Sequence, residues 1–376
     1  MMIYLDYAAT TPMSEQAIEV YSEVAKNVFG NTSSLHDIGT KANSLLEHAR
    51  AELASCINGM KDGVYFTSGG TESNHLILET IIRSYQGKGN HIITTKIEHS
   101  SIINFFNKLE QVGYEITYLP VDTNGKVNIA DLEQAIKPTT ILASIHHGNS
   151  EIGVIQDLEA IGKLLKEHSI IFHSDCVQTF GKHPIDVVQL NLDAISISSH
   201  KIYGPKGVGA AFLHPAVHWK PIYPNTTHEN GFRPGTINLP GIAAFVTAAQ
   251  QICEQMEFTQ NNYKELREHL KQGLTSLEDN IDIIENSTHQ LPHIVGLCIK
   301  GIEGQYMMLE CNRYGLAIST GSACAVGQQS PSKTMLAMGK TREEAKQFIR
   351  LSFGKSTTFE IIDQVITIFK NSVIVK

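Results

Sequence analysis

The chain has 376 residues, of which 42% are hydrophobic and 18% are charged, so it is long enough for one large globular core and a second, smaller one. The net charge of -8 does not indicate the basic face that binding to nucleic-acid phosphates requires, so we expect no nucleic-acid partner. The N-terminus has no signal-peptide pattern and no apolar stretch reaches the roughly 20 residues of a membrane span. We therefore expect a cytoplasmic protein without membrane contacts.

Apolar runs bounded by turn residues alternate with helical patterns from about residue 14 to 215. They predict strands at 63–67, 91–95, 115–119, 140–146, 170–174, 193–198 and 207–213, and helices at 71–86, 99–112 and 157–167, the last with Asp157 as its N-cap. This alternation is typical of an α/β protein with a mostly parallel sheet. Ligands of such sheets bind beyond the carboxyl ends of the strands, where we expect the functional residues.

The pattern changes after Pro240. A helical stretch over 241–277 leads to a strand at 293–300 and to helices at 304–313, 341–349 and 358–373. We interpret this region as a smaller α/β domain. The prediction is a large domain over 12–255 and a small domain made of 1–11 and 256–376.

The motif SGGTES at 68–73 lies between a predicted strand and a predicted helix. Small residues such as Gly70 let the backbone approach an anion, the helix N-terminus supplies N–H donors, and Thr71 adds a hydroxyl. A plain glycine-rich turn is an equally good interpretation of this motif in isolation.

The motif HSDCVQ at 173–178 ends an apolar strand, where an unpaired carboxylate would be costly to bury. Asp175 therefore needs a cationic partner, for which a protonated pyridine nitrogen is one choice and a loop-capping role is the alternative. Gln178 could contact a phenolic oxygen on the same ring. Cys176 would point to the opposite face of the strand, where we expect it to serve packing.

The motif SISSHKIYGPKG at 196–207 places a lysine after a buried strand. A lysine with a lowered pKa forms a Schiff base with an aldehyde, and we assign this role to Lys201, with Ser198 and His200 directed to a phosphate. The alternative, a surface lysine in a Gly-Pro loop, suits Lys206 better.

The six cysteines are scattered without a C-x-x-C pair, so neither a disulfide framework nor a zinc site is indicated. Cys324 differs from the others because it lies in STGSACAVG (319–327), a run of small residues, whereas Cys298 lies in an apolar run. A reactive cysteine must be accessible, which favours Cys324. His146, His147 and His173 are interpreted as hydrogen-bonded histidines, and we expect no metal.

Together these motifs resemble those of the NifS/IscS-like cysteine desulfurases, a group within the class V aminotransferases. Enzymes of this class depend on pyridoxal 5'-phosphate (PLP) and have the α/β fold known as fold type I. The resemblance covers nearly the whole chain: YLDYAATTP (4–12), FGNTSS (29–34), TSGGTES (67–73), TKIEHSS (95–101), NSEIG (149–153), HSDCVQ, SSHKIYGPKG, RPGT (233–236), GSAC (321–324) and IRLSFG (349–354). The set is highly specific, although no single motif is.

The resemblance implies a role for each matching residue. Lys201 would hold PLP and move the α-proton of L-cysteine, Asp175 would pair with the pyridinium nitrogen, and His99 would stack on the ring and take part in proton transfer. The remaining cofactor contacts would be Gly70, Thr71, Asn149, Gln178, Ser198, His200 and, from the other subunit of a homodimer, Thr236. Asn31 and Arg350 would bind the substrate carboxylate.

The reaction implied by the resemblance converts L-cysteine to L-alanine and leaves the sulfur as a persulfide on Cys324, which passes it to an acceptor protein for iron-sulfur cluster assembly. The short chain and the HSDCVQTFGK variant resemble desulfurases that supply quinolinate synthase in NAD biosynthesis. We expect no C-terminal extension of the kind that scaffold-docking relatives use. One departure is Ser150, where many relatives have a second asparagine, which places the PLP contact of Asn149 in question.

Two other interpretations stay open. A selenocysteine lyase or an aminotransferase of the same fold would keep the PLP residues, but a transaminase has no need of Cys324. A regulatory or sulfur-carrier protein could keep the fold and lose the chemistry, against which the presence of Lys201, Asp175 and His99 argues.

Overall fold

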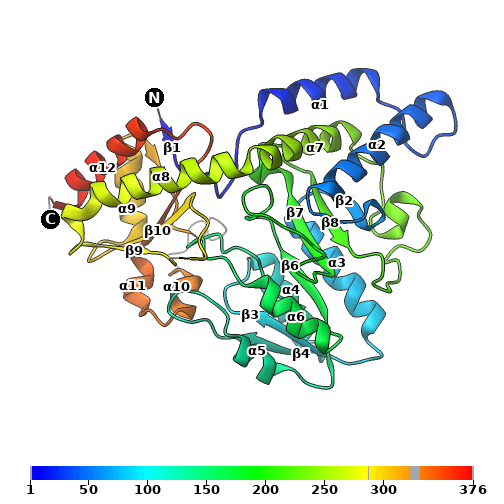
Figure 1. Ribbon diagram of the computed structural model, residues 1–376, viewed down its shortest axis with the longest axis horizontal. Helices are drawn as coiled ribbons and strands as arrows, with labels where there is room; N and C mark the ends of the chain where they lie inside the picture. Colours follow the sequence, from blue (N-terminus) through cyan, green and yellow to red (C-terminus); the bar gives the residue numbers. More distant parts are fainter. Residues whose placement is uncertain (1, 287, 322–330, 375–376) are drawn as a thin grey trace.

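The computed structural model describes residues 2–286, 288–321 and 331–374. They form a large unit around a seven-stranded sheet and a smaller unit around a three-stranded sheet, with two long helices running between them (Figure 1). No helix in these ranges is long and apolar enough to cross a membrane.

The large sheet has the strand order β2-β8-β7-β6-β5-β3-β4. These strands are β2 (Val64–Thr67), β8 (Gly209–Leu213), β7 (Ala194–Ser198), β6 (Ile171–Asp175), β5 (Thr140–Ser144), β3 (His91–Thr95) and β4 (Glu115–Leu119). The five strands from β7 to β4 are parallel, whereas β8 runs antiparallel to both of its neighbours. The prediction of a mostly parallel sheet is confirmed.

Helices cover both faces of this sheet because its strands are apolar on both sides. One core contains Tyr65, Ile92 and Leu142 and is covered by α3 (Gly70–Tyr85) and α4 (Ser100–Glu110). The opposite core contains Phe66, Ile93 and Ala143, the next residue along each strand. It is covered by α1 (Glu15–Asn27), α2 (Asp37–Ser55), α6 (Leu158–Glu167) and α7 (Leu239–Glu254), and α5 (Ile129–Ala135) packs beside α6. Asp157 caps α6 as expected, because its side chain accepts a hydrogen bond from the Ala160 N–H.

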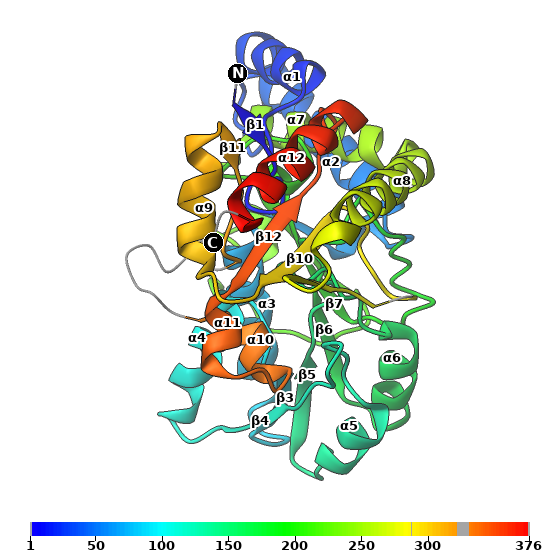
Figure 2. The ribbon, with the colours of Figure 1, turned by 90° about the vertical axis from the view of Figure 1, so that its left-hand side faces the viewer.

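The smaller unit has an antiparallel sheet in the order β12-β10-β9, formed by β12 (Phe348–Ser352), β10 (Ile294–Ile299) and β9 (Ile281–Ile284). Packed around it are α8 (Met256–Leu274), α9 (Gly304–Arg313), α10 (Lys333–Ala337), α11 (Arg342–Lys346) and α12 (Phe359–Ile374) (Figure 2). The N-terminal β1 (Ile3–Tyr4) pairs with β11 (Leu316–Ala317) in this unit. The division into 12–255 and the remainder stays a prediction.

Two helix predictions in this part of the chain are wrong in detail. The stretch at 241–277 forms two helices, because α7 ends at Glu254 and α8 begins at Met256. The predicted helix at 341–349 ends at Lys346, and the residues from Phe348 onward form β12. Pairing with β10 buries the apolar side chains of β12, so tertiary contacts override the local helical pattern.

Candidate active site

A pocket of about 380 Å³ lies at the N-terminus of α3, beyond the end of β2. Its lining brings together four residues predicted to bind a phosphate: Gly70, Thr71, Ser198 and His200. Thr10, which also lines the pocket, was not expected from the sequence, and Lys206, another lining residue, was expected to be an ordinary surface lysine. The match of Thr10 to the YLDYAATTP motif was the signal that could have found it.

Glycine is required where the chain enters α3. Gly69 has a φ of +150°, which side chains rarely allow. A Cβ atom on Gly70 would lie 2.7 Å from Val177 Cγ2, and one on Gly209 of β8 would lie 2.6 Å from Gly69 Cα. The absence of side chains therefore lets the turn lie against the sheet and leaves the N–H groups of α3 facing the pocket, an arrangement suited to an anion.

His200 enters the pocket as a neutral side chain. Burial and then the charges of Lys201, Lys182 and Lys206 lower its pKa to about 4. Its Nδ1 atom lies 3.1 Å from Thr10 Oγ1. The positive charge of the pocket near neutral pH therefore comes from the lysines and the helix N-terminus.

Asp175 ends β6 and is only 8% exposed. Its Oδ1 atom accepts a hydrogen bond from the Val177 N–H at 3.0 Å, and its Oδ2 atom accepts one from Asn74 Nδ2 at 2.8 Å. Asn74 Nδ2 also lies 3.0 Å from Ser101 Oγ, which lies 2.8 Å from His99 Nδ1. The buried amide of Asn74 thus connects Asp175 to His99. The sequence did not indicate this connection, because Asn74 is one of several polar residues in the first turns of α3.

His99 is exposed and caps α4, where its Nδ1 atom accepts a hydrogen bond from the Ser101 N–H at 3.2 Å. This bond fixes the orientation of the imidazole ring relative to α4. The opposite ring nitrogen, Nε2, is left for exchange with solvent or a ligand.

Lys201 and Gln178 meet at the N-terminal segment. Lys201 closes a short 3₁₀ helix (Ser199–Lys201) after β7, and its Nζ atom donates to the carbonyl oxygens of Ala8 at 2.6 Å and Ala9 at 2.7 Å. Gln178 Nε2 donates to the same Ala8 oxygen at 3.1 Å, while Gln178 Oε1 is buried without a hydrogen bond in the described structure. A buried acceptor without a donor is costly, so Gln178 is suited to a ligand that supplies one.

Arg350 lies in β12 and is only 2% exposed. Its guanidinium group donates to Asp6 Oδ1 at 2.5 Å and to the Ser150 carbonyl oxygen at 2.8 Å. The Nε atom is buried and has no hydrogen-bond partner among the described residues. The side chain predicted to bind a substrate carboxylate is therefore held by a carboxylate of the protein itself.

The other predicted site residues lie outside these contacts. Asn149 is buried, but its Oδ1 atom accepts hydrogen bonds from the N–H groups of Glu151 and Ile152, so it holds a turn. Asn31 and Thr236 are exposed in loops. Cys324 lies outside the described residues, and the roles given to all four stay predictions.

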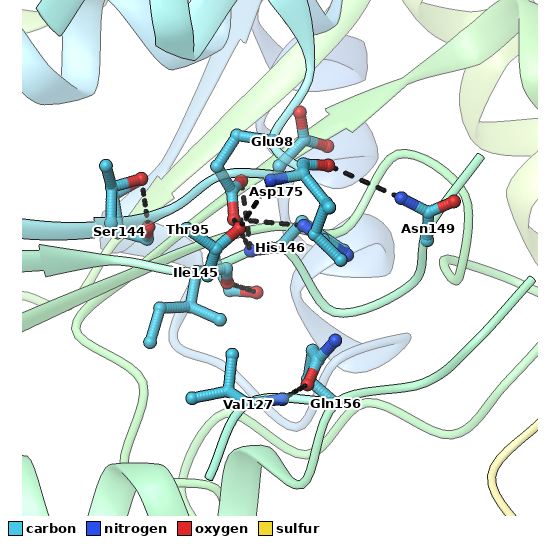
Figure 3. Close-up of polar contacts among 12 residues, drawn as sticks. Thr95, Glu98, Val127, Ser144, Ile145, His146, Asn149, Gln156 and Asp175 are labelled. Carbon is cyan, nitrogen blue, oxygen red and sulfur yellow. Dashed lines mark hydrogen bonds and ion pairs between the residues drawn. The ribbon is translucent and has the colours of Figure 1, made fainter. Parts of the chain in front are cut away.

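A buried ion pair supports the strand ends next to Asp175 (Figure 3). Glu98 Oε1 lies 2.9 Å from His146 Nδ1 and accepts hydrogen bonds from the His146 N–H at 3.0 Å and from Thr95 Oγ1 at 2.7 Å. Burial lowers the pKa of His146, but Glu98 and, to a smaller extent, Asp175 outweigh it and raise the pKa. His146 was a candidate from the sequence, whereas its partner Glu98 was not.

The other two histidines are buried and neutral, because burial lowers the pKa of both His147 and His173 to about 3. His173 Nδ1 lies 2.9 Å from Ser144 Oγ and its Nε2 lies 3.1 Å from Ser196 Oγ. No group of three or more potential ligands for a metal ion occurs within the described part of the chain. Cys176 lies in the large core, where burial raises its pKa to about 12.

Comparison with known proteins shows the family to which the chain belongs. The aminotransferase class-V family model matches residues 3–365. Among similar proteins, the putative cysteine desulfurase NifS of Bacillus subtilis is 48% identical over 98% of this chain and 94% of its own length. The cysteine desulfurase IscS of Dictyoglomus turgidum is 36% identical over 98% and 93%.

Solved structures agree with these matches. A NifS-like protein superimposes with a TM-score of 0.93 at 30% identity over the whole of both chains. SspA in complex with cysteine has a TM-score of 0.82 at 29% identity and covers 93% of this chain and 98% of its own. The chain therefore belongs to the aminotransferase class-V family, among the NifS/IscS-like proteins.

Proposed function

We propose that this protein is a cysteine desulfurase that uses PLP to convert L-cysteine to L-alanine and transfers the sulfur to Cys324. The observation that carries the proposal is the position of a glycine-lined anion pocket, a buried carboxylate and a lysine around the carboxyl ends of neighbouring strands. Relatives that are named cysteine desulfurases and match almost the full chain support the same activity.

The side chains present fit PLP. The cofactor carries a phosphate, a pyridinium nitrogen and a phenolic oxygen. The pocket at the N-terminus of α3 suits the phosphate, and Asp175 supplies a negative charge for the nitrogen. Gln178, whose oxygen lacks a donor and whose amide lies beside Lys201, would face the ring.

When bound, PLP supplies an electron-poor ring that stabilises a carbanion at the α-carbon of an amino acid. Lys201 would link the cofactor and, once displaced by the substrate amine, take the α-proton with its Nζ atom. The Ala8 and Ala9 carbonyl oxygens hold this Nζ atom in place. Asn74 fixes the Asp175 carboxylate, and its contact with Ser101 couples that carboxylate to the orientation of His99.

The thiolate of Cys324 would attack the substrate sulfur. A sulfur–sulfur bond forms, the carbon–sulfur bond of the substrate breaks, and the bonding electrons remain on the carbon, which is protonated to give alanine. The persulfide then passes its outer sulfur to an acceptor protein for iron-sulfur cluster assembly. Quinolinate synthase of NAD biosynthesis stays our prediction for that acceptor.

The substrate carboxylate would bind Arg350 with the help of Asn31. Arg350 already contacts Asp6 and the Ser150 carbonyl oxygen, so the substrate has to share or replace the Asp6 contact. Its unpartnered Nε atom offers one further donor.

The proposal includes a homodimer in which Thr236 of one subunit completes the phosphate site of the other. The exposure of Thr236 outside the pocket of its own subunit supports this arrangement. We further propose that the protein acts in the cytoplasm, and that the large and small domains meet near residue 255.

The test measures alanine and sulfide released from L-cysteine in the presence of a thiol reductant. Cys324→Ala should lose nearly all alanine release while it keeps the PLP absorbance. Cys56→Ser, a change at a partly exposed cysteine that is distant from Cys324 in sequence, should behave like the wild type. Lys201→Ala should lose both covalent PLP and activity, with Lys108→Ala as the control for an exposed lysine. Equal alanine release by Cys324→Ala and wild type would refute the persulfide step and favour a selenocysteine lyase or an aminotransferase.

A further inference from the structure

A second, smaller pocket lies where the large and small units meet, and Tyr7 and Thr11 of the N-terminal segment contribute to its lining. Its volume is about 10 Å³, which is the space of a single water-sized particle. It is lined from several elements: Lys182 after β6, Tyr203 after β7, Tyr263 on α8, His293 before β10 and Lys355 after β12. Segments far apart in sequence thus converge on a space for one small particle.

The charges around this pocket are uncompensated. None of its lining residues is acidic, and the side chain of Lys182 forms no ion pair or hydrogen bond with the described residues. Lys355 Nζ lies 4.8 Å from the centre of the Tyr203 ring and likewise forms no ion pair there. A partly buried ammonium group without a counter-charge, such as that of Lys182, is unfavourable, and the exposed Lys355 adds a second positive charge to the lining of the same space.

The pocket is also lined by neutral side chains that can donate hydrogen bonds. The Tyr203 hydroxyl already accepts one from the Lys355 N–H at 2.8 Å and contacts the Tyr263 hydroxyl, whereas His293 has a ring nitrogen without a partner in the described structure. His293 is only 2% exposed, and its Nε2 atom is buried without a partner in the described structure. Burial and the nearby charges of Lys182, Arg267 and Arg350 lower the pKa of His293 well below its ordinary value, so the ring is neutral and its Nε2 atom can carry the proton. Burial raises the pKa of Tyr203 to about 12, so its hydroxyl also keeps its proton near neutral pH.

We propose that this pocket binds one small monovalent anion of halide size, held by Lys182 and Lys355 and by hydrogen bonds from the surrounding neutral donors. The small volume favours a monatomic anion over phosphate, sulfate and carboxylates, and the lack of an acidic lining residue disfavours a cation. A water molecule fits the space but leaves the two ammonium charges without a partner. The anion contacts residues of both units and therefore stabilises their junction.

The anion also lies near the candidate active site. Burial and the charge of Lys201 lower the pKa of Lys182 to about 7, and Lys182 in turn contributes to the lowered pKa of His200. A negative charge beside Lys182 reduces the positive potential at Lys182 and at His200. Occupancy of the small pocket thus adjusts the electrostatics of the α3 pocket without contact between them.

The direct experiment is a crystal of the holoenzyme soaked in sodium bromide, which gives an anomalous diffraction signal. The expected result is a peak within hydrogen-bonding distance of Lys182 Nζ in the wild type and no peak in Lys182→Met. Lys108→Gln, a change of an exposed lysine on α4, should keep the peak. A wild-type crystal without a peak in this pocket overturns the proposal.

A solution experiment guards against a failure of the variant to fold. The melting temperature of the holoenzyme is followed at about pH 6.5 while sodium gluconate is replaced by sodium chloride at constant ionic strength. We expect a rise that grows with the logarithm of the chloride concentration and reaches about 2–4 °C at 100 times Kd for the wild type and Lys108→Gln. Lys182→Met should show no rise and Tyr263→Phe a weaker one. An equal response of Lys182→Met and wild type would reveal general salt effects and overturn the proposal.

Discussion

Removal of the Glu98 carboxylate tests how the strand ends are held next to Asp175. Glu98 has a fully buried side chain that accepts hydrogen bonds from Thr95 Oγ1 and from the backbone N–H of His146, and it pairs with His146 Nδ1. The opposite ring nitrogen of His146 is already buried without a partner in the described structure. Glu98→Ala therefore leaves a buried imidazole with no acceptor on either side.

Breaking a buried ion pair by removal of one partner costs about 3–5 kcal/mol. With an unfolding entropy of about 2.1 cal/mol/K per residue, a chain of 376 residues loses roughly 4–6 °C of melting temperature for this cost. Glu98→Gln keeps an oxygen acceptor and loses only the charge, so we expect about 1.5–3 kcal/mol. PLP should also bind less tightly, because the next N–H group, that of His147, donates to the Asp175 carbonyl oxygen at 3.0 Å.

The assay is guanidinium unfolding followed by circular dichroism, together with PLP absorbance, for Glu98→Ala, His146→Asn and the double variant. The double variant should cost less than the sum of the two single changes, because the charge of the pair is then removed as a whole. Additive losses, or a loss below about 1 kcal/mol for Glu98→Ala, would refute the assignment of a buried ion pair.

Three further predictions follow from individual contacts. Asn74→Ala removes a hydrogen bond to the Asp175 carboxylate, worth about 1.5–3 kcal/mol, and should lower PLP affinity in a dialysis titration by about ten- to a hundredfold, whereas Asn74→Asp should not restore it because two carboxylates would then face each other. Asp6→Asn should lower KM for L-cysteine and lower the melting temperature together, since Arg350 loses the carboxylate that holds it; an unchanged KM would contradict competition between Asp6 and the substrate. His173 has a folded pKa of about 3, below the unfolded value of about 6.5, so the folded state binds fewer protons and the free energy of unfolding falls as pH drops from 6.5 toward 3. In His173→Asn the free energy of unfolding should fall by about 2 kcal/mol less between pH 6.5 and pH 5 than in the wild type. Parallel stability–pH curves for variant and wild type would contradict this expectation.

The sequence determined the local features of this protein. Runs such as 91–95 and 170–174 are rich in isoleucine, threonine and phenylalanine, which favour strands, and each is bounded by turn residues, so β3 and β6 were predictable. Asp157 was predictable as a cap because the polar residue immediately precedes a helical pattern. The turn before α3 was predictable because only glycine adopts its backbone angles and permits its close packing.

The tertiary structure decided which distant residues meet. Asp6 and Arg350 are 344 positions apart, and nothing in local periodicity indicates that a carboxylate of the N-terminal segment holds an arginine of β12. Phe348 lies in a strand because β10 offers it hydrogen bonds and a buried face, which no local pattern records. The hydrogen bonds that link Asp175 through Asn74 to Ser101 depend in the same way on long-range packing, and so does the position of Lys182 in the small pocket at the junction of the two units. Hydrogen bonds and charges act through space, whereas sequence patterns report only neighbours along the chain.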